Sequence, residues 1–533
     1  MDVTWRAAAG PGQEIGNSPG PRMQRRVLGA LTLNDLVGLL GTVVALAFLW
    51  GRGRHVWYWL DEGISIGIAS HPLGEIPGLL RQDGAPPLYY GLLHGWMRLF
   101  GRSESSTHIL SLVFALAAVP AGLWAGWSLF GRRAGWITAL LVAISPFLGA
   151  YANEARMYTL VVLLCLVATA TFLHAFVFRR RRRYLPAFAV CLTLLLYTHN
   201  WGLFFALATG LAVLALIALS PSGALRRQLL VDGALVFGAA GLLYLPWLPT
   251  LAYQVAHTGA PFTLRPTLLK VRSDVMDLVG GETAVLALGL GSGMAFLAML
   301  RRPWTKDSLA ALVAGGIAAV AIGAGWAISR DNSVWVYRYL AVVLGPILLF
   351  LGAGLARSGR SATAALAVMV VLFAPVAVKG QAFDKSNVKQ VATELGGRLK
   401  AGDLVVADFG RVPVLSTYLP AGLRYAETTG PVPDPWASDQ RDATRRLDEG
   451  HPAATLIPSL DALPVGGHVL VVCSAGTLAD DATPFLRLIF ERCNEARALA
   501  EGDDRFRLDG TVKAIAYLSN SPVDGFLLTK LTA

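Results

Sequence analysis

The sequence has 533 residues, of which 54% are hydrophobic and only 15% charged, and its net charge is +11 at pH 7. A soluble globular protein carries about 25% charged residues, whereas here apolar runs of about 20 residues recur, each long enough to cross a bilayer as a helix. Because much of the basic excess lies in short clusters between these runs, it indicates membrane topology. The composition therefore predicts a polytopic α-helical membrane protein and excludes a soluble protein and a nucleic-acid-binding protein.

Residues 1–30 form a polar tail with arginines at positions 22, 25 and 26, and the first apolar run follows it. No small-residue cleavage site comes after this run, so we expect a retained anchor with a cytoplasmic N-terminus. Lysine and arginine concentrate in cytoplasmic loops, and the strongest such cluster is "RRRRR" at residues 179–183. We predict about 11 transmembrane helices, at residues 33–51, 106–130, 134–149, 157–178, 184–199, 201–219, 229–249, 284–300, 308–328, 335–356 and 361–379.

This topology predicts a transmembrane domain over residues 31–379 with a long external loop at 52–105. The segment "PPLYYGLLHGWMRLFG", residues 86–101, is apolar but short. Counted as a span, it would place the later arginine clusters outside. We therefore expect it to be an interfacial helix on the outer face, where its aromatic side chains suit the headgroup region.

From residue 380 to 533 charges become frequent and the apolar runs shorten to strand length, as in "DLVVADF" and "HVLVVCS". Alternation with helical segments such as "SNVKQVATELGGRLKAGD" predicts an extracytoplasmic α/β domain. Cys473 and Cys493 lie in this domain. They either form a disulfide, if the compartment is oxidising, or stay reduced, and their spacing does not decide between the two.

The stretch "WYWLDEGISIGIAS", residues 57–70, places Asp61 and Glu62 side by side just after the first span. Acids near a membrane surface lose solvation, so such a pair is a candidate functional site; the alternative is a pair of charges at a helix N-terminus. Asp83 precedes two prolines that fix the start of the next helix. It is either a second functional acid or a turn residue.

Two further external segments carry cations. "SPFLGAYANEARMY", residues 145–158, holds Glu154 and Arg156, and "SRDNSVWVYRYL" places Arg338 between two tyrosines. An arginine outside the membrane runs against the usual charge bias, and either an acid or a ligand phosphate explains it. Arg338 suits a lipid-linked phosphate, or else anchors the interface. Together these acids and cations are the set that transfer of a glycosyl phosphate needs: a base for the acceptor hydroxyl, and charge or a metal for the departing phosphate.

The segments "WLDEGISIGIAS", "DGAPPLYYGLLHGWMRLFG", "SPFLGAYANEARMY" and "VYRYL" resemble the GT-C superfamily of membrane glycosyltransferases. The nearest pattern is that of the family 39-like enzymes, which include protein O-mannosyltransferases and the lipid A aminoarabinose transferase. "GAYANEARMY" also resembles an acidic motif of oligosaccharyltransferases, in which an aspartate stands where this chain has Ala152 or Asn153.

The resemblance implies a GT-C fold, a polyprenyl-phosphate sugar donor, and inverting transfer outside the plasma membrane to a cell-envelope glycan, glycolipid or protein. Separately, the composition, rich in alanine, arginine and glycine, suggests a high-GC bacterium and favours mannosyl or arabinofuranosyl transfer. Asp61 matches the family's catalytic aspartate and Glu62 its neighbour. It further implies a divalent cation (Mg, Mn or Ca) at Asp61 and Glu154, and an acceptor-binding role for the C-terminal domain. The substrate contacts predicted from the motifs and the external loops are Asp83, Tyr89, Glu154, Arg156, Tyr158, His199, His257, Tyr337 and Arg338.

Two other functions compete with this reading. A transporter or flippase of a lipid-linked sugar would use the same apolar groove and cations but has no need of adjacent external acids, and it often shows two related halves. A membrane scaffold that presents the C-terminal domain would leave both the acid pair and the external arginines unexplained.

Overall fold

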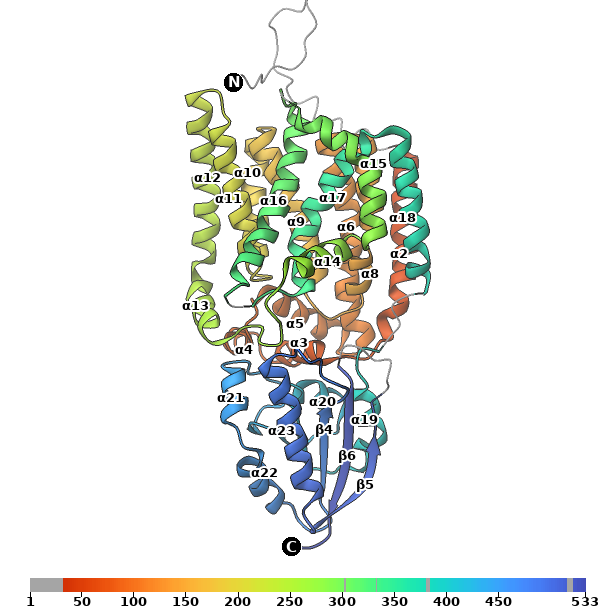
Figure 1. Ribbon diagram of the computed structural model, residues 1–533, viewed down its shortest axis with the longest axis vertical. Helices are drawn as coiled ribbons and strands as arrows, with labels where there is room; N and C mark the ends of the chain where they lie inside the picture. The colour runs from red at the N-terminus through yellow and green to blue at the C-terminus, as the bar shows by residue number, and fades with distance from the viewer. Residues whose placement is uncertain (1–31, 302, 332, 380–383, 515–520) are drawn as a thin grey trace, which may run out of the picture.

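The computed structural model describes residues 32–301, 303–331, 333–379, 384–514 and 521–533, so the predicted N-terminal tail lies outside the described residues. A bundle of long helices and a smaller α/β domain follow one another along the long axis of the molecule (Figure 1). Short helices α3 (Leu60–Ser70), α4 (Ile76–Asp83) and α5 (Leu88–Phe100) lie where the two parts meet. The predicted interfacial segment is thus α5, which packs against α3 and against the bundle helix α6.

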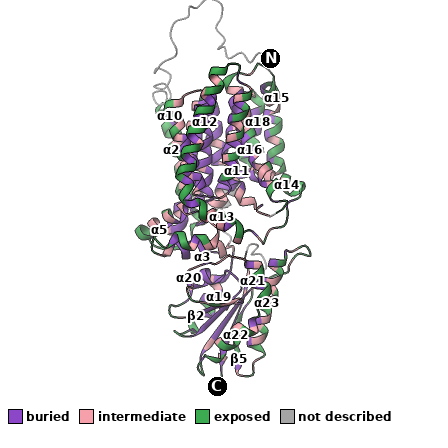
Figure 2. Ribbon diagram, turned by 90° about the vertical axis from the view of Figure 1, so that its left-hand side faces the viewer, coloured by how far each residue is buried: buried purple, intermediate pink, exposed green. Residues whose placement is uncertain are grey.

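The bundle follows the predicted apolar runs closely. Its helices are α2 (Leu33–Gly51), α6 (Glu104–Phe130), α7 (Arg132–Ala143), α8 (Pro146–Tyr151), α9 (Tyr158–Phe172), α10 (Arg181–Leu196), α11 (Gly202–Ala218), α12 (Gly223–Tyr244), α15 (Glu282–Leu300), α16 (Lys306–Ile328), α17 (Ala341–Ala356) and α18 (Gly359–Lys379). The shorter α13 (Leu248–His257) and α14 (Leu268–Leu278) connect α12 to α15. Helices α9 and α17 are buried along most of their length, whereas α2 exposes leucines such as Leu33 and Leu40. Figure 2 shows exposed residues, in green, along the outside of the bundle. A helix that is apolar on its exposed face is suited to lipid.

Seven helices among the described residues are long and apolar enough to cross a membrane, and the chain is therefore a multi-pass membrane protein. They are Leu33–His55, Glu104–Phe130, Tyr158–Val177, Gly223–His257, Glu282–Leu300, Lys306–Ile328 and Tyr337–Ala356. Gly202–Ala218 and Gly359–Phe373 are shorter apolar helices. Helix α7 is only 12 residues long and α10 begins with three arginines, so the count of about 11 spans stays a prediction.

Two of the predicted basic clusters are paired with buried acids. Arg179 and Arg181 both contact Asp232 of α12, whose side chain is fully buried, and the Arg179 Nη2–Asp232 Oδ2 distance is 2.8 Å. Arg132 pairs with Asp35 of α2 at 2.6 Å. These ion pairs tie the loops to helices α2 and α12 of the bundle.

The α/β domain is built on a six-stranded sheet of order β3-β2-β1-β4-β6-β5. The strands are β1 (Leu404–Ala407), β2 (Arg424–Glu427), β3 (Gly430–Val432), β4 (His468–Ser474), β5 (Phe506–Val512) and β6 (Val523–Lys530). Strand β1 runs parallel to both β2 and β4, and the other pairs are antiparallel. The helices of this domain are α19 (Val388–Glu394), α20 (Val412–Tyr418), α21 (Ala443–Glu449), α22 (Pro452–Asp461) and α23 (Pro484–Glu501). The predicted α/β domain is confirmed.

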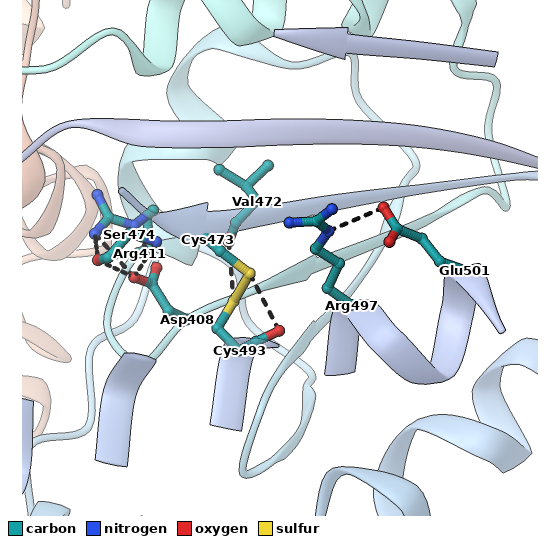
Figure 3. Close-up of a disulfide and its surroundings, with 8 residues drawn as sticks. All are labelled: Asp408, Arg411, Val472, Cys473, Ser474, Cys493, Arg497 and Glu501. Atoms are coloured by element: carbon teal, nitrogen blue, oxygen red, sulfur yellow. Dashed lines mark hydrogen bonds and ion pairs between the residues drawn. A yellow bond between two sulfur atoms is a disulfide. The ribbon is translucent and has the colours of Figure 1, made fainter. Parts of the chain in front are cut away.

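The two cysteines of the α/β domain form a disulfide, which is one of the two alternatives that the sequence left open. Cys473, near the end of β4, forms a disulfide with Cys493 of α23, and the bond fastens that helix to the sheet (Figure 3). Beside it, Arg411 pairs with Asp408, and Ser474 donates a hydrogen bond to the same carboxylate. Through these contacts the residues that follow β1 are bonded to the carboxyl end of β4.

The α/β domain docks on the bundle through two glycines of α3. A Cβ added at Gly63 would lie 2.4 Å from the Cβ of Val414 in α20, and one at Gly67 would lie 2.3 Å from the carbonyl oxygen of Trp436. Both distances are far below van der Waals contact, so this approach requires glycine. An ion pair between Lys389 and Glu104, at 2.7 Å, adds a second tie between the two parts.

Candidate functional site

The predicted acids lie in the first turn of α3, at the junction of the bundle and the α/β domain. Helix α3 begins at Leu60, so Asp61 and Glu62 both meet the positive end of the helix dipole, as the alternative interpretation of this motif expected. The dipole alone does not explain the pair, because the two side chains have different surroundings and different partners.

Asp61 faces two arginines. Its Oδ2 lies 2.9 Å from Arg338 Nη2 and 3.9 Å from Arg156 Nη2. Arg156 also donates from Nη1 to the backbone oxygen of Asp61 at 3.3 Å and to Ser65 Oγ at 3.0 Å, which fixes its direction. The Asp61 side chain keeps 15% of its surface exposed. The structure thus brings together three residues that lie in three separate sequence motifs.

Glu62 is directed into the protein and is 1% exposed. It accepts a hydrogen bond from the backbone N–H of Ala155 at 2.7 Å and pairs with His108 Nε2 at 2.7 Å. The other ring nitrogen of His108 lies 2.9 Å from the carbonyl oxygen of Arg54 and donates to it. Through the Ala155 N–H and His108, Glu62 connects α3 to the loop before α9 and to α6. The sequence analysis missed His108, which lies in the first turns of α6 and looks like a core residue.

A lysine that the sequence analysis also missed completes this group. Lys385, at the start of the α/β domain, contacts the carboxylate of Glu154, and its Nζ lies 5.6 Å from the centre of the Trp59 ring. The Arg338 guanidinium lies 5.6 Å from the same ring. Burial lowers the pKa of Lys385 to about 8. We use the name Asp61 cluster for Asp61, Arg156, Arg338, Glu154, Lys385 and Trp59.

Aromatic rings border the Asp61 cluster on the bundle side. The ring of Tyr158 lies 6.4 Å from that of Tyr339 and 6.0 Å from His199, and His199 and Tyr339 are 4.7 Å apart. Arg156 lies 5.8 Å from the Tyr158 ring. Tyr337 lies apart from this group, since its ring packs on Phe147, 5.8 Å away, whereas the ring of Tyr339 lies 5.8 Å from the Arg338 guanidinium.

The remaining predicted residues have varied positions. Asp83 ends α4, and burial raises its pKa to about 6 although the charge of Arg156 opposes this shift. Tyr89 is fully buried with its hydroxyl 3.4 Å from Ser111 Oγ, so it is a core residue of α5. His257 pairs with Asp442 of the α/β domain at 3.4 Å rather than with the Asp61 cluster, which makes it a docking residue.

Buried polar atoms without a hydrogen-bond partner gather at this site. Within the described residues they include Trp59 Nε1, Tyr90 OH, Asn153 Oδ1, Glu154 Oε2, Arg156 Nε and Arg338 Nε. More than nine in ten buried polar groups in proteins are satisfied, by protein or by ordered water, so these atoms have hydrogen-bonding capacity that the protein itself does not use.

The predicted divalent cation at Asp61 and Glu154 stays a prediction, and in this structure each of the two carboxylates has a cationic side chain as its partner. Asp61 faces two arginines and Glu154 faces a lysine, so both carboxylates are already neutralised. Across the part of the chain that the structure describes, no three histidine, cysteine, aspartate or glutamate side chains come together as a metal site.

The sequence matches no protein-family model and no curated protein. The structure, however, resembles ArnT from Cupriavidus metallidurans in the apo state, with a TM-score of 0.58 and 12% identity over 92% of this chain and 98% of that one. ArnT bound to undecaprenyl phosphate gives the same TM-score at 14% identity.

Archaeal oligosaccharyltransferase AglB from Archaeoglobus fulgidus, in complex with an inhibitory peptide and a dolichol-phosphate, has a TM-score of 0.52 at 12% identity over 91% of this chain and 80% of that one. Arabinofuranosyltransferase AftD from Mycobacteria has the same TM-score at 14% identity, over 96% of this chain and 40% of that one. These similar proteins are all GT-C glycosyltransferases. The protein therefore has the GT-C fold, with an α/β domain after its helical bundle.

Proposed function

We propose that this protein is an inverting glycosyltransferase that moves a sugar from a polyprenyl-phosphate donor to a cell-envelope acceptor. The observation that carries the proposal is the carboxylate of Asp61, held between Arg156 and Arg338 next to apolar helices. The fold supports it, since ArnT with this fold has been seen with undecaprenyl phosphate. The carboxylate of Asp61 acts as the base, and the guanidinium groups of Arg156 and Arg338 bind the donor phosphate.

In the proposed reaction the donor phosphate engages Arg156 and Arg338, which releases the Asp61 carboxylate from its ion pairs. Asp61 then takes the proton of the acceptor hydroxyl. The acceptor oxygen attacks the anomeric carbon from the face opposite the phosphate, and the bond from that carbon to the phosphate oxygen breaks. The leaving polyprenyl phosphate gains a second negative charge, so two fixed guanidinium groups bind it more tightly in the transition state than in the donor.

We propose that the site and the α/β domain lie outside the plasma membrane. The disulfide between Cys473 and Cys493 favours an oxidising compartment for the α/β domain. The cluster at residues 179–183 lies toward the opposite end of the bundle, where the positive-inside rule favours the cytoplasm.

The sugar is proposed to be mannose or arabinofuranose, and one experiment tests both it and the enzyme class. Purified protein in lipid is given radiolabelled polyprenyl-phosphate mannose and polyprenyl-phosphate arabinofuranose in parallel, with a cell-envelope extract as acceptor. We expect label to move to the acceptor from one donor, and to be lost in Asp61→Asn but not in Asp442→Asn, a control acid at the domain junction. The alternative function is a flippase: label that crosses the bilayer still attached to lipid, equally in both variants, would refute the transferase.

A further inference from the structure

The start of the α/β domain is held firmly from both sides. The carboxylate of Asp384 accepts a hydrogen bond from the backbone N–H of Trp57 at 2.8 Å, just before α3. On the other side, Ser521 donates its backbone N–H to the carbonyl oxygen of Lys385 at 3.0 Å, and Asn387 exchanges two hydrogen bonds of 2.8 Å with the backbone of Val523. The backbone of Lys385 is therefore carried by the α/β domain, while its side chain reaches a site built by the bundle.

The ammonium group of Lys385 has one carboxylate as its direct partner, Glu154, while the charges of Asp61 and Glu62 also act on it. In the Asp61 cluster three cations, Arg156, Arg338 and Lys385, have two carboxylates as direct partners, Asp61 and Glu154. All five side chains are at least four-fifths buried. The second oxygen of Glu154 has no hydrogen-bond partner. A cation that is mostly withdrawn from water needs an anion close by. Lys385 has a single carboxylate in direct contact and faces the same Trp59 ring as Arg338, so it lies beside the arginines of the proposed phosphate site.

We propose that Lys385 is a third phosphate-binding residue of the donor site, and that Glu154 holds it in place until the donor binds. This inference rests on the proposed function. An ammonium on a four-carbon chain can turn from one anion to another, so Lys385 exchanges Glu154 for a phosphate oxygen. Because Lys385 belongs to the α/β domain, the donor site is complete only while that domain is docked on the bundle.

Paired variants test the proposal. Binding of polyprenyl phosphate, without a sugar, is measured together with transfer for Lys385→Met, Lys385→Arg, Glu154→Gln and Lys389→Met. Lys389 is the matched control: it is the next lysine along the same segment, at the start of α19, and ties the domains through Glu104, outside the Asp61 cluster. Melting temperature is recorded for each variant.

We expect Lys385→Met to weaken binding of polyprenyl phosphate about 10-fold and to slow transfer about 10²-fold, as for loss of one donor to a developing charge. Lys385→Arg should restore most of both, and Lys389→Met should change neither by more than about 3-fold. Glu154→Gln should bind polyprenyl phosphate more tightly, because Lys385 loses its competing partner. If the ion pair between Lys385 and Glu154 were purely structural, Lys385→Met and Glu154→Gln would both weaken binding of polyprenyl phosphate.

Unchanged binding in Lys385→Met, or equal losses in Lys385→Met and Lys389→Met, would overturn the proposal. Its failure is distinct from failure of the proposed function. If the wild type transfers no sugar but Lys385→Met still weakens binding of polyprenyl phosphate, the proposed phosphate site is supported and the proposed glycosyltransferase activity is refuted.

Discussion

Replacing Gly63 with alanine should separate the two parts of the molecule. The added Cβ would lie 2.4, 2.5 and 2.7 Å from the Cβ, Cα and backbone N of Val414, whereas ordinary contact begins at 3.4 Å. Two of these three atoms belong to the backbone of α20, so no rotamer change relieves the overlap, and α20 must retreat by about 1 Å. Asp61 stays on the bundle side while Lys385 moves with the α/β domain.

Two magnitudes follow from this displacement. Overpacking of a close contact costs about 1–3 kcal/mol, so we expect a lower melting temperature for purified Gly63→Ala. A misplacement of about 1 Å in a reacting site reduces rate about 10²-fold, so transfer should fall by that factor. Gly78→Ala, in α4 with nothing within 4 Å of its added Cβ, is the control and should match the wild type. Normal melting and normal transfer in Gly63→Ala would refute the close docking of α3 on α20.

Three other predictions concern single features. His108→Ala leaves Glu62 buried without its ionic partner and should destabilise the protein by about 3–5 kcal/mol; a thermal unfolding curve that matches the wild type would rule out the pair. Burial raises the pKa of Glu427 from 4.5 to about 7, so its protonated form favours the folded α/β domain, and stability should decline as pH rises from about 4.5 to 7. Glu427→Gln should flatten that decline in melting temperature, and an unaltered profile would contradict it. Since Asp61 and Glu154 are neutralised by cations, transfer should persist in excess EDTA, and its loss, with recovery on adding Mg, Mn or Ca, would support the predicted metal site.

The features that were predicted correctly from the sequence are those that depend on residues close together in the chain. The apolar runs form the bundle helices because, in a membrane, the backbone N–H and C=O groups of each run must form hydrogen bonds within that run. The strand-length runs after residue 380 give the sheet, and the external motifs around Asp61, Arg156 and Arg338 do meet in space.

The features it missed depend on contacts between distant segments. The residues around Lys385 do not indicate that its side chain contacts Glu154, in the loop before α9. Likewise, the residues around Glu62 do not indicate that its carboxylate pairs with His108, 46 residues away. Tyr337 was predicted and Tyr339 was not, although both flank Arg338; the 3₁₀ turn at Tyr337–Leu340 directs them to different neighbours. The pairing of Cys473 depends on how α23 returns to β4, which spacing does not fix.

The buried contact between Asp232 and the arginines of the 179–183 cluster also bears on the order of events during synthesis. Asp232 follows Arg181 by 51 residues, so at about 5–20 residues per second it leaves the ribosome roughly 3–10 s later. During that interval the arginines lack this partner. Once α12 arrives, Asp232 pairs with Arg179 and Arg181 and fixes the segment between α9 and α10 to α12.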